Sequence, residues 1–191
     1  MKYFKINEKE ILKINNGVCT KVQFQITPFK ISEEEINNID FPQLEELSFD
    51  ECIDSLKNGI YETIDKLINN YESKIMKNNE LIDNFGNIKL DYLKYFLLDF
   101  SKNNPIFVVL KDEKYEIIEI KDDLTIEEID FNMNEKSKLK EINFDEFKMR
   151  IIQNKEKYYK KNNIMYYDKI LELKKLILEI QNLDISFVMG E

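Results

Sequence analysis

The longest amphipathic stretch of the chain, from Ser48 to Lys77, sets the main constraint on the fold. Its apolar residues recur every three or four positions, which places them on one face of a helix. They are Phe49, Cys52, Ile53, Leu56, Ile60, Ile64, Leu67, Ile68, Tyr71 and Ile75. Ser48 followed by Glu51 forms a capping-box pair that marks the start of this helix. Because the helix would be about 45 Å long, the rest of the chain is needed to cover its apolar face.

Composition excludes several kinds of chemistry. The 191 residues are 43% hydrophobic and 34% charged, as in a globular protein of one domain or one domain with an appendage. The chain has no His, and Arg150 is its only Arg. A Ser-His-Asp triad, a Cys-His dyad, a His-ligated metal and an arginine-rich phosphate clamp are therefore excluded.

The formal net charge of -9 indicates a protein that repels nucleic acid on average. Cys19 and Cys52 are too few for a disulfide framework or a zinc site, so we expect two small buried thiols. The N-terminus lacks a signal-peptide core, and no apolar run approaches the length of a membrane span. These observations predict a soluble cytoplasmic protein with no cofactor and no membrane partner.

Two β-hairpins are predicted. The first has Asn15-Asn16-Gly17 between two strands, and its second arm, Val18 to Thr27, alternates apolar and polar residues. The second covers residues 106–121, where an unbroken apolar run is followed by a polar turn and a returning strand. We expect both hairpins to join in one small antiparallel sheet.

Four helices are predicted, over residues 48–77, 89–102, 143–161 and 164–182, the third capped by Asn143. Asn162-Asn163 is expected to separate the last two, which would form a helical hairpin. Short helical turns are expected after Ser32 and Thr125. No internal repeat is evident. The predicted fold is α+β, with a core over residues 1–142 and the helical hairpin over residues 143–191 packed on it.

Acidic residues are concentrated between Ile31 and Leu56, where no Lys or Arg occurs. Such a patch can occupy a basic groove on a partner and steer association with a basic protein, although a solvated surface is the common explanation of charge runs. The candidate partner-binding acids are Glu33, Glu34, Glu35, Glu45, Glu46, Asp50, Glu51 and Asp54. A second acidic stretch runs from Asp112 to Asp130.

A Lys- and Tyr-rich segment follows between Asn143 and Asn182. Aromatic residues among cations can stack on bases, but they are also favoured at protein interfaces and at half-buried helix junctions. Tyr158, Tyr159, Tyr166 and Tyr167 are therefore candidate partner-binding residues, with a protein partner favoured over RNA or DNA.

Glu119-Ile120-Lys121 is the sharpest catalytic candidate. It follows Pro105, an apolar strand, a turn and a second strand, an order that resembles the PD-(D/E)xK nuclease core. Residues two apart in a strand face the same way, so Glu119 and Lys121 should lie side by side. The resemblance implies metal binding by carboxylates and a water-orienting Lys. The sequence departs from the family where the metal-binding Asp should follow Pro105, because Ile106 stands there. Charges on the solvent face of an edge strand are the alternative.

Two functional hypotheses follow. The first is a small acidic protein that binds a macromolecular partner with a basic surface, as an inhibitor, an immunity protein or an adaptor. A phage or mobile element could encode such an inhibitor, and the strongly apolar last helix could make the protein a homodimer. The second is a PD-(D/E)xK-like metal-dependent nuclease, active or decayed, that uses Glu119 and Lys121.

Overall fold

The computed structural model describes residues 1–37, 44–98, 105–121 and 125–185. Its α+β class is as expected, but the described residues form two antiparallel five-stranded sheets and two long helices instead of one sheet and four helices. The chain divides into two compact units. Unit 1 comprises Met1–Glu72 and Tyr167–Glu191, and unit 2 comprises Ser73–Tyr166.

The sheet of unit 1 is formed by the first five strands, in the order β4-β3-β2-β1-β5. Their bounds are β1 Lys2–Asn7, β2 Glu10–Asn15, β3 Val18–Ile26, β4 Phe29–Glu35 and β5 Glu45–Leu47. The predicted hairpin at Asn16 and Gly17 is confirmed, because both residues have positive φ (49° and 84°) and join β2 to β3. The helical turn predicted after Ser32 is wrong, since Ser32 lies within β4.

The sheet of unit 2 has the order β10-β6-β7-β8-β9. Its strands are β6 Lys94–Leu98, β7 Ile106–Lys111, β8 Lys114–Ile120, β9 Ile126–Asp130 and β10 Lys140–Ile142, and a short 3₁₀ helix, η1, spans Met133–Lys138. The second predicted hairpin is confirmed as β7 and β8. It belongs to a different sheet from the first, so the expectation of a single sheet is wrong.

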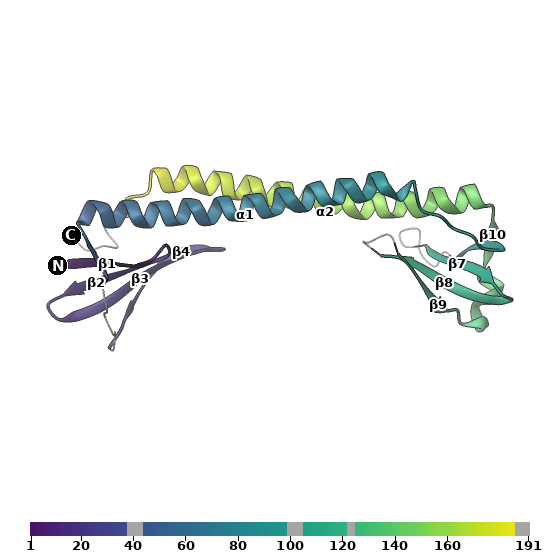
Figure 1. The fold of residues 1–191 in the computed structure, drawn as a ribbon, viewed down its shortest axis with the longest axis horizontal. Coiled ribbons are helices and arrows are strands. Elements are labelled where there is room, and N and C mark those ends of the chain that lie inside the picture. The colour runs from purple at the N-terminus through teal and green to yellow at the C-terminus, as the bar shows by residue number, and fades with distance from the viewer. Residues whose placement is uncertain (38–43, 99–104, 122–124, 186–191) are drawn as a thin grey trace. The chain divides into compact units, whose positions relative to one another are not determined.

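Helix α1 spans Phe49–Phe85 and helix α2 spans Phe144–Gln181. The capping box is confirmed: the Ser48 backbone N–H donates to Glu51 Oε2 at 2.8 Å, and the Glu51 N–H donates to Ser48 Oγ at 3.3 Å. Asn143 caps α2 as expected, with its Oδ1 accepting from the Glu146 N–H at 2.8 Å. Within each unit, part of α1 runs beside part of α2 (Figure 1).

Two helix predictions fail for identifiable reasons. Residues 94–98 of the predicted helix 89–102 form β6, and residues 99–102 lie outside the described residues. The expected break at Asn162-Asn163 is absent because α2 continues through it. Asn163 is only 7% exposed, accepts from Asn78 Nδ2 at 2.7 Å and donates to Asn79 Oδ1 at 2.9 Å. These partners satisfy the polar side chain within the helix, so there is no helical hairpin over residues 143–182.

The core of unit 1 contains strand residues such as Ile11 and Val22 together with the part of the predicted α1 stripe that precedes Ser73, whereas Ile75 is buried in unit 2. The most deeply buried members of that stripe are Cys52, Leu56, Ile60 and Ile64. In unit 2, one core cluster joins the sheet to both helices through residues such as Val109, Phe85 and Phe147. A second cluster, which includes Phe96 and Val108, covers the opposite face of that sheet.

The two halves of the chain repeat one topology. Among the described residues, each half has five strands followed by a long helix, and in each sheet the half's first strand lies between its second and fifth strands. The first residues of the two helices, Phe49 and Phe144, differ by 95 in number, so we call helix positions 95 apart equivalent. The sequence analysis missed this repeat.

Short sequence matches support the repeat. Lys-Tyr-Phe occurs at 2–4 and at 94–96, and Phe-Asp-Glu occurs at 49–51 and at 144–146. Tyr3 contacts the Phe49 ring at a centroid distance of 5.8 Å, and Tyr95 contacts the Phe144 ring at 5.4 Å. The ion pair of Lys2 with Glu46 (3.1 Å) likewise matches that of Lys94 with Glu141 (3.2 Å).

Candidate functional site

Five carboxylates line a groove in unit 1 between the β1–β5 edge of the sheet and the first turns of α1. We call it the acidic groove, and its volume is about 360 Å³. It contains Glu45, Glu51 and Asp54 from the predicted set, and Glu8 and Glu62, which the sequence analysis missed. Lys5 is the cation in its lining, and Leu47, Ser55, Asn58 and Gly59 complete it.

The carboxylates of the acidic groove differ in their partners. Hydrogen bonds from the Ser48 backbone and hydroxyl lower the pKa of Glu51, so this carboxylate is held ionised. Lys66 pairs with Glu8 at 3.3 Å and with Glu62 at 3.9 Å. Within the described residues, the side chains of Glu45 and Asp54 make neither a hydrogen bond nor an ion pair, although Lys5 lies opposite Glu45 in the β1–β5 ladder. The groove therefore retains uncompensated negative charge.

The other predicted acids lie elsewhere in unit 1. Glu33, Glu34 and Glu35 lie on β4, at the opposite edge of the sheet from β5. Glu33 pairs with Lys13 at 2.9 Å and Glu34 with Lys21 at 3.4 Å. Such charges on an edge strand hinder pairing with another sheet. Glu46 pairs with Lys2, and exposed Asp50 lies at the start of α1, outside the groove lining.

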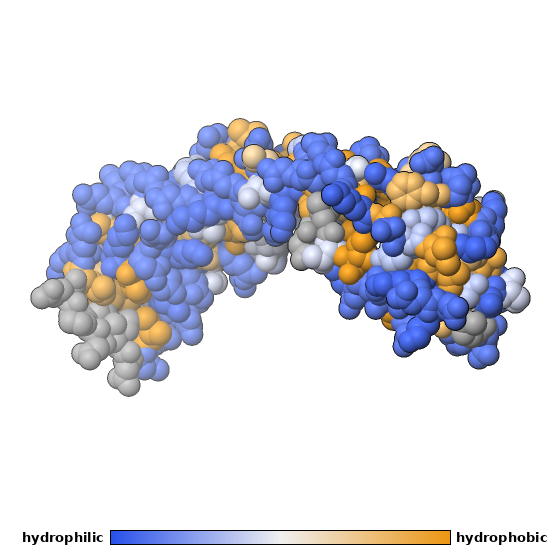
Figure 2. Space-filling view, turned by 45° about the vertical axis from the view of Figure 1, so that its right-hand side comes forward, coloured by the Kyte–Doolittle hydropathy of each residue, from blue (hydrophilic) through white to orange (hydrophobic). Residues whose placement is uncertain are grey.

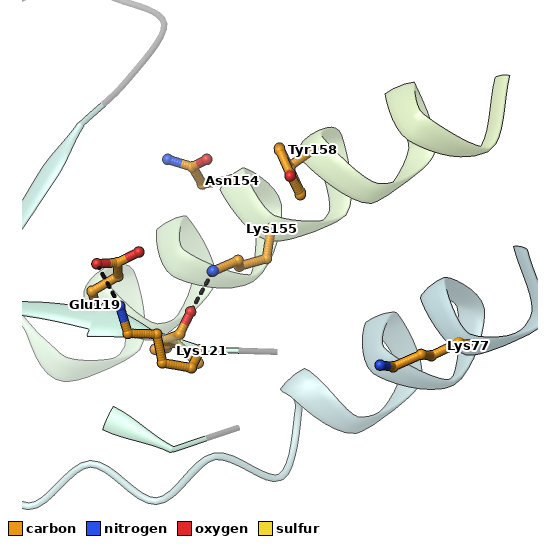
Figure 3. A pocket seen from close by; sticks show the side chains of 7 residues that line it. Lys77, Glu119, Lys121, Asn154, Lys155 and Tyr158 are labelled. Carbon is orange, nitrogen blue, oxygen red and sulfur yellow. Dashed lines mark hydrogen bonds and ion pairs between the residues drawn. The ribbon is translucent and has the colours of Figure 1, made fainter. Parts of the chain in front are cut away.

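A second hollow lies in unit 2, where α1, α2 and the end of β8 meet (Figure 3). We call it the lysine pocket; it is open and has a volume of about 810 Å³. Its lining consists of Lys77, Glu119, Ile120, Lys121, Asn154, Lys155 and Tyr158. Three lysines and one glutamate give this lining a net positive charge in a chain of formal charge -9.

The three lysines are held differently. Lys121 pairs with Glu127 at 2.5 Å and with Glu119 at 3.1 Å, and these hydrogen bonds raise the pKa of its ammonium. Lys155 extends from α2 and donates to the carbonyl oxygen of Ile120, as Figure 3 shows. Lys77 is exposed on α1, and its side chain has no partner within the described residues.

The tyrosines predicted to form a cluster have separate environments. Tyr159 is 2% exposed and stacks on Phe85 at a centroid distance of 5.7 Å, which makes it a core residue of unit 2. Tyr158 is 57% exposed and lines the lysine pocket. Lys74 lies over the Tyr166 ring at 5.7 Å. Tyr167 is exposed in unit 1.

The residues of the nuclease resemblance are close together. Glu119 and Lys121 lie at the end of β8 and pair with each other, so the carboxylate already has a cation beside it. Ile106, which stands where the family has its metal-binding Asp, begins β7. In the part of the chain that the structure describes, no group of three or more Cys, Asp or Glu side chains is arranged to hold a metal ion. The nuclease assignment stays a hypothesis.

Two signals in the sequence could have revealed the missed residues. Glu51, Asp54, Asn58 and Glu62 recur at helical spacing and so form a polar stripe along α1. On α2, Lys155 interrupts the apolar stripe of Phe147, Ile151 and Tyr159. A charged residue at a position where the helical period predicts an apolar one indicates that this position does more than pack in the core.

Comparison of the chain with protein-family models, curated proteins and solved structures found no match. Among the described residues, neither helix has a stretch apolar enough to span a membrane. Hydrophilic residues dominate the visible face in Figure 2.

Proposed function

We propose that this protein is a non-catalytic binding protein whose acidic groove holds a basic segment of a partner protein. The observation that carries the proposal is the lining itself, with five carboxylates and one lysine. The carboxylates of Glu45 and Asp54 form no ion pair within the described residues, so a partner's Lys or Arg side chains could pair with them. Inhibitor, immunity protein and adaptor are roles that such binding can serve.

The repeat supports a functional origin for these charges. The positions equivalent to Glu45 and Glu62 carry Lys140 and Lys157 in unit 2, and the position of Ser55 carries Arg150. There Glu146, the equivalent of Glu51, pairs with Arg150 at 3.1 Å. The same strand-and-helix scaffold therefore folds with basic residues at these positions, so its packing does not require the acids of unit 1.

The expected electrostatic contribution is modest for each residue and larger for the groove as a whole. An exposed pair contributes about 0.2–1 kcal/mol, so removing two carboxylates should cost about 1 kcal/mol of binding free energy, or about fivefold in Kd. The groove's net charge should also accelerate association at low ionic strength, and salt should suppress this effect.

The test uses a fluorescein-labelled peptide of alternating Lys and Gly, followed by fluorescence anisotropy at about 20 and about 200 mM NaCl. We expect the double variant Glu45→Gln, Asp54→Asn to bind about fivefold more weakly at low salt. The matched control is Glu35→Gln, Glu72→Gln, which removes the same charge from exposed positions of unit 1 outside the groove. Equal weakening by both double variants would refute the groove as the site, because net charge alone would then explain binding.

The nuclease hypothesis makes a separate prediction. If Glu119 served a metal-dependent reaction, Glu119→Ala would abolish Mg²⁺-dependent cleavage of DNA or RNA, whereas the groove variant would leave cleavage unchanged. If the wild-type protein shows no Mg²⁺-dependent cleavage, this hypothesis is excluded and the binding proposal is unaffected.

A further inference from the structure

The unusual residue of unit 2 is Lys155. It stands on α2 four residues after Ile151 and four before Tyr159, both of which are buried. Its equivalent on α1 is Ile60, which is fully buried in the core of unit 1. A lysine therefore occupies a position where the same scaffold elsewhere places an aliphatic core residue.

Lys155 is half-buried, and its ammonium has no carboxylate partner in the part of the chain that the structure describes. Its hydrogen bond goes to the carbonyl oxygen of Ile120, and within the described residues no acid lies at ion-pair distance. The nearby Glu119 is already paired with Lys121 at 3.1 Å. An ammonium group has three N–H donors and carries a full charge, so Lys155 can bind a further acceptor, most favourably an anion.

An apolar pocket of about 250 Å³ adjoins this ammonium. Ile106, Phe107, Ile117, Ile129 and Ile151 are among its lining residues. Four residues line both this pocket and the lysine pocket: Glu119, Ile120, Asn154 and Lys155. The Lys155 ammonium therefore stands where the apolar space meets the open one, and the one carboxylate there, Glu119, is paired with Lys121. This volume equals the liquid volume of about eight water molecules, which is enough for a short aliphatic chain or a single ring.

We propose that unit 2 binds a small organic anion with an apolar body. Its carboxylate or phosphate group would contact Lys155 and Asn154, and its apolar body would fill the pocket beside Ile117 and Ile151. Lys77, at the open side, would add positive charge. Few convergent polar groups at the mouth of an apolar cavity are typical of small-molecule sites. This proposal is independent of the acidic groove in unit 1.

Isothermal titration calorimetry tests the proposal with octanoate and octyl phosphate as anionic probes. Octan-1-ol and octylamine supply the same chain with a neutral and a cationic end. We expect both anions to bind with 1:1 stoichiometry and about tenfold or more tightly than octan-1-ol, because a charge-assisted hydrogen bond is lost with the alcohol. Octylamine should bind more weakly still.

Lys155→Met and Lys155→Gln should each weaken binding of the anions by about tenfold or more without weakening octan-1-ol. Both variants remove the positive charge. Two are used because Met is apolar and can fill part of the pocket, whereas Gln keeps a neutral hydrogen-bond donor. Lys157→Met is the control, since Lys157 is exposed on the same helix and lines neither pocket. Circular dichroism establishes that each variant is folded.

Three calorimetric results would overturn the proposal. They are the absence of saturable binding by either anion, equal affinity for octanoate and octan-1-ol, and anion affinities that Lys155→Met and Lys155→Gln leave unchanged. Methyl NMR spectra locate the site, because anion binding should shift the methyl signals of Ile117 and Ile151. Shifts confined to isoleucines of unit 1 would also refute it.

Discussion

Replacing Gly59 by alanine should destabilise unit 1 strongly, because no space exists for a methyl group. Gly59 is buried on α1, where the turn between β1 and β2 approaches the helix. A Cβ at this position would lie 1.7 Å from the carbonyl oxygen of Glu8 and 3.4 Å from the Phe24 ring. The obstructing atom belongs to the backbone, so no rotation of a side chain can relieve the overlap.

The magnitude follows from the required displacement. Real Cβ contacts essentially never fall below 3.0 Å, so the turn must move by at least 1.3 Å, the difference between 3.0 and 1.7 Å. Overpacking typically costs about 1–3 kcal/mol, and more where backbone must shift. Alanine returns up to about 1 kcal/mol through its better helix propensity. We expect a net loss of about 2 kcal/mol, or about 4–8 °C in Tm for a chain of this size.

Urea denaturation followed by far-UV circular dichroism measures the free energy of unfolding. Hydrogen exchange then locates the effect, which should be a greater loss of protection in unit 1 than in unit 2. Gly86→Ala is the control, because its Cβ would meet no atom within 4 Å. If Gly59→Ala matched the wild type and the control in stability, the close approach of the Glu8 turn to α1 would be wrong.

Three further results are expected. Glu113→Gly should raise the stability of unit 2 by about 1 kcal/mol in a denaturant titration, because Glu113 has φ +67° in the β7–β8 turn; an unchanged midpoint would contradict that conformation. Asn163→Leu should lower the free energy of unfolding by about 1–3 kcal/mol, since Asn78 and Asn79 lose their partner, and a stabilised variant would contradict the network. For the homodimer hypothesis, light scattering should give a dimer mass for the wild type and a monomer mass for Leu171→Glu, because Leu171 is 53% exposed on α2; a wild-type monomer would exclude it.

The sequence predicted correctly those turns and helix ends whose structure depends on a few neighbouring residues. Asn16-Gly17 specifies a tight turn, and the Ser48–Glu51 capping box specifies a helix start. The stripe that includes Cys52 and Ile64 is buried as its period requires. Burial also raises the pKa of the Cys52 thiol to about 12, as expected for an inert core cysteine.

Tertiary partners decided the elements that were predicted wrongly. In β6, Tyr95 and Leu97 pack towards the helices while Phe96 and Leu98 pack on the other face of the sheet. Because both faces are apolar, the sequence of β6 lacks the apolar–polar alternation by which a strand is distinguished from a helix. The continuity of α2 depends on Asn163 finding Asn78 and Asn79, which are more than 80 residues away in sequence.

The candidate site was predictable only in part for the same reason. Sequence reasoning singled out the acids near the start of α1 but could not separate those of the groove from those of β4, because strand order determines which of them meet. It also missed Lys155, whose significance depends on the apolar pocket beside it and on the comparison with Ile60.

The repeated topology has a consequence for how sites can arise in this protein. A dimer of identical chains must carry every substitution twice, so a groove that becomes acidic in one copy becomes acidic in the other. Here the two copies of the scaffold are encoded separately within one chain, and each can change alone. Glu45 and Lys140 stand at matching places with opposite charge, and so do Glu62 and Lys157. One polypeptide can thereby carry two differently charged surfaces on a single architectural plan.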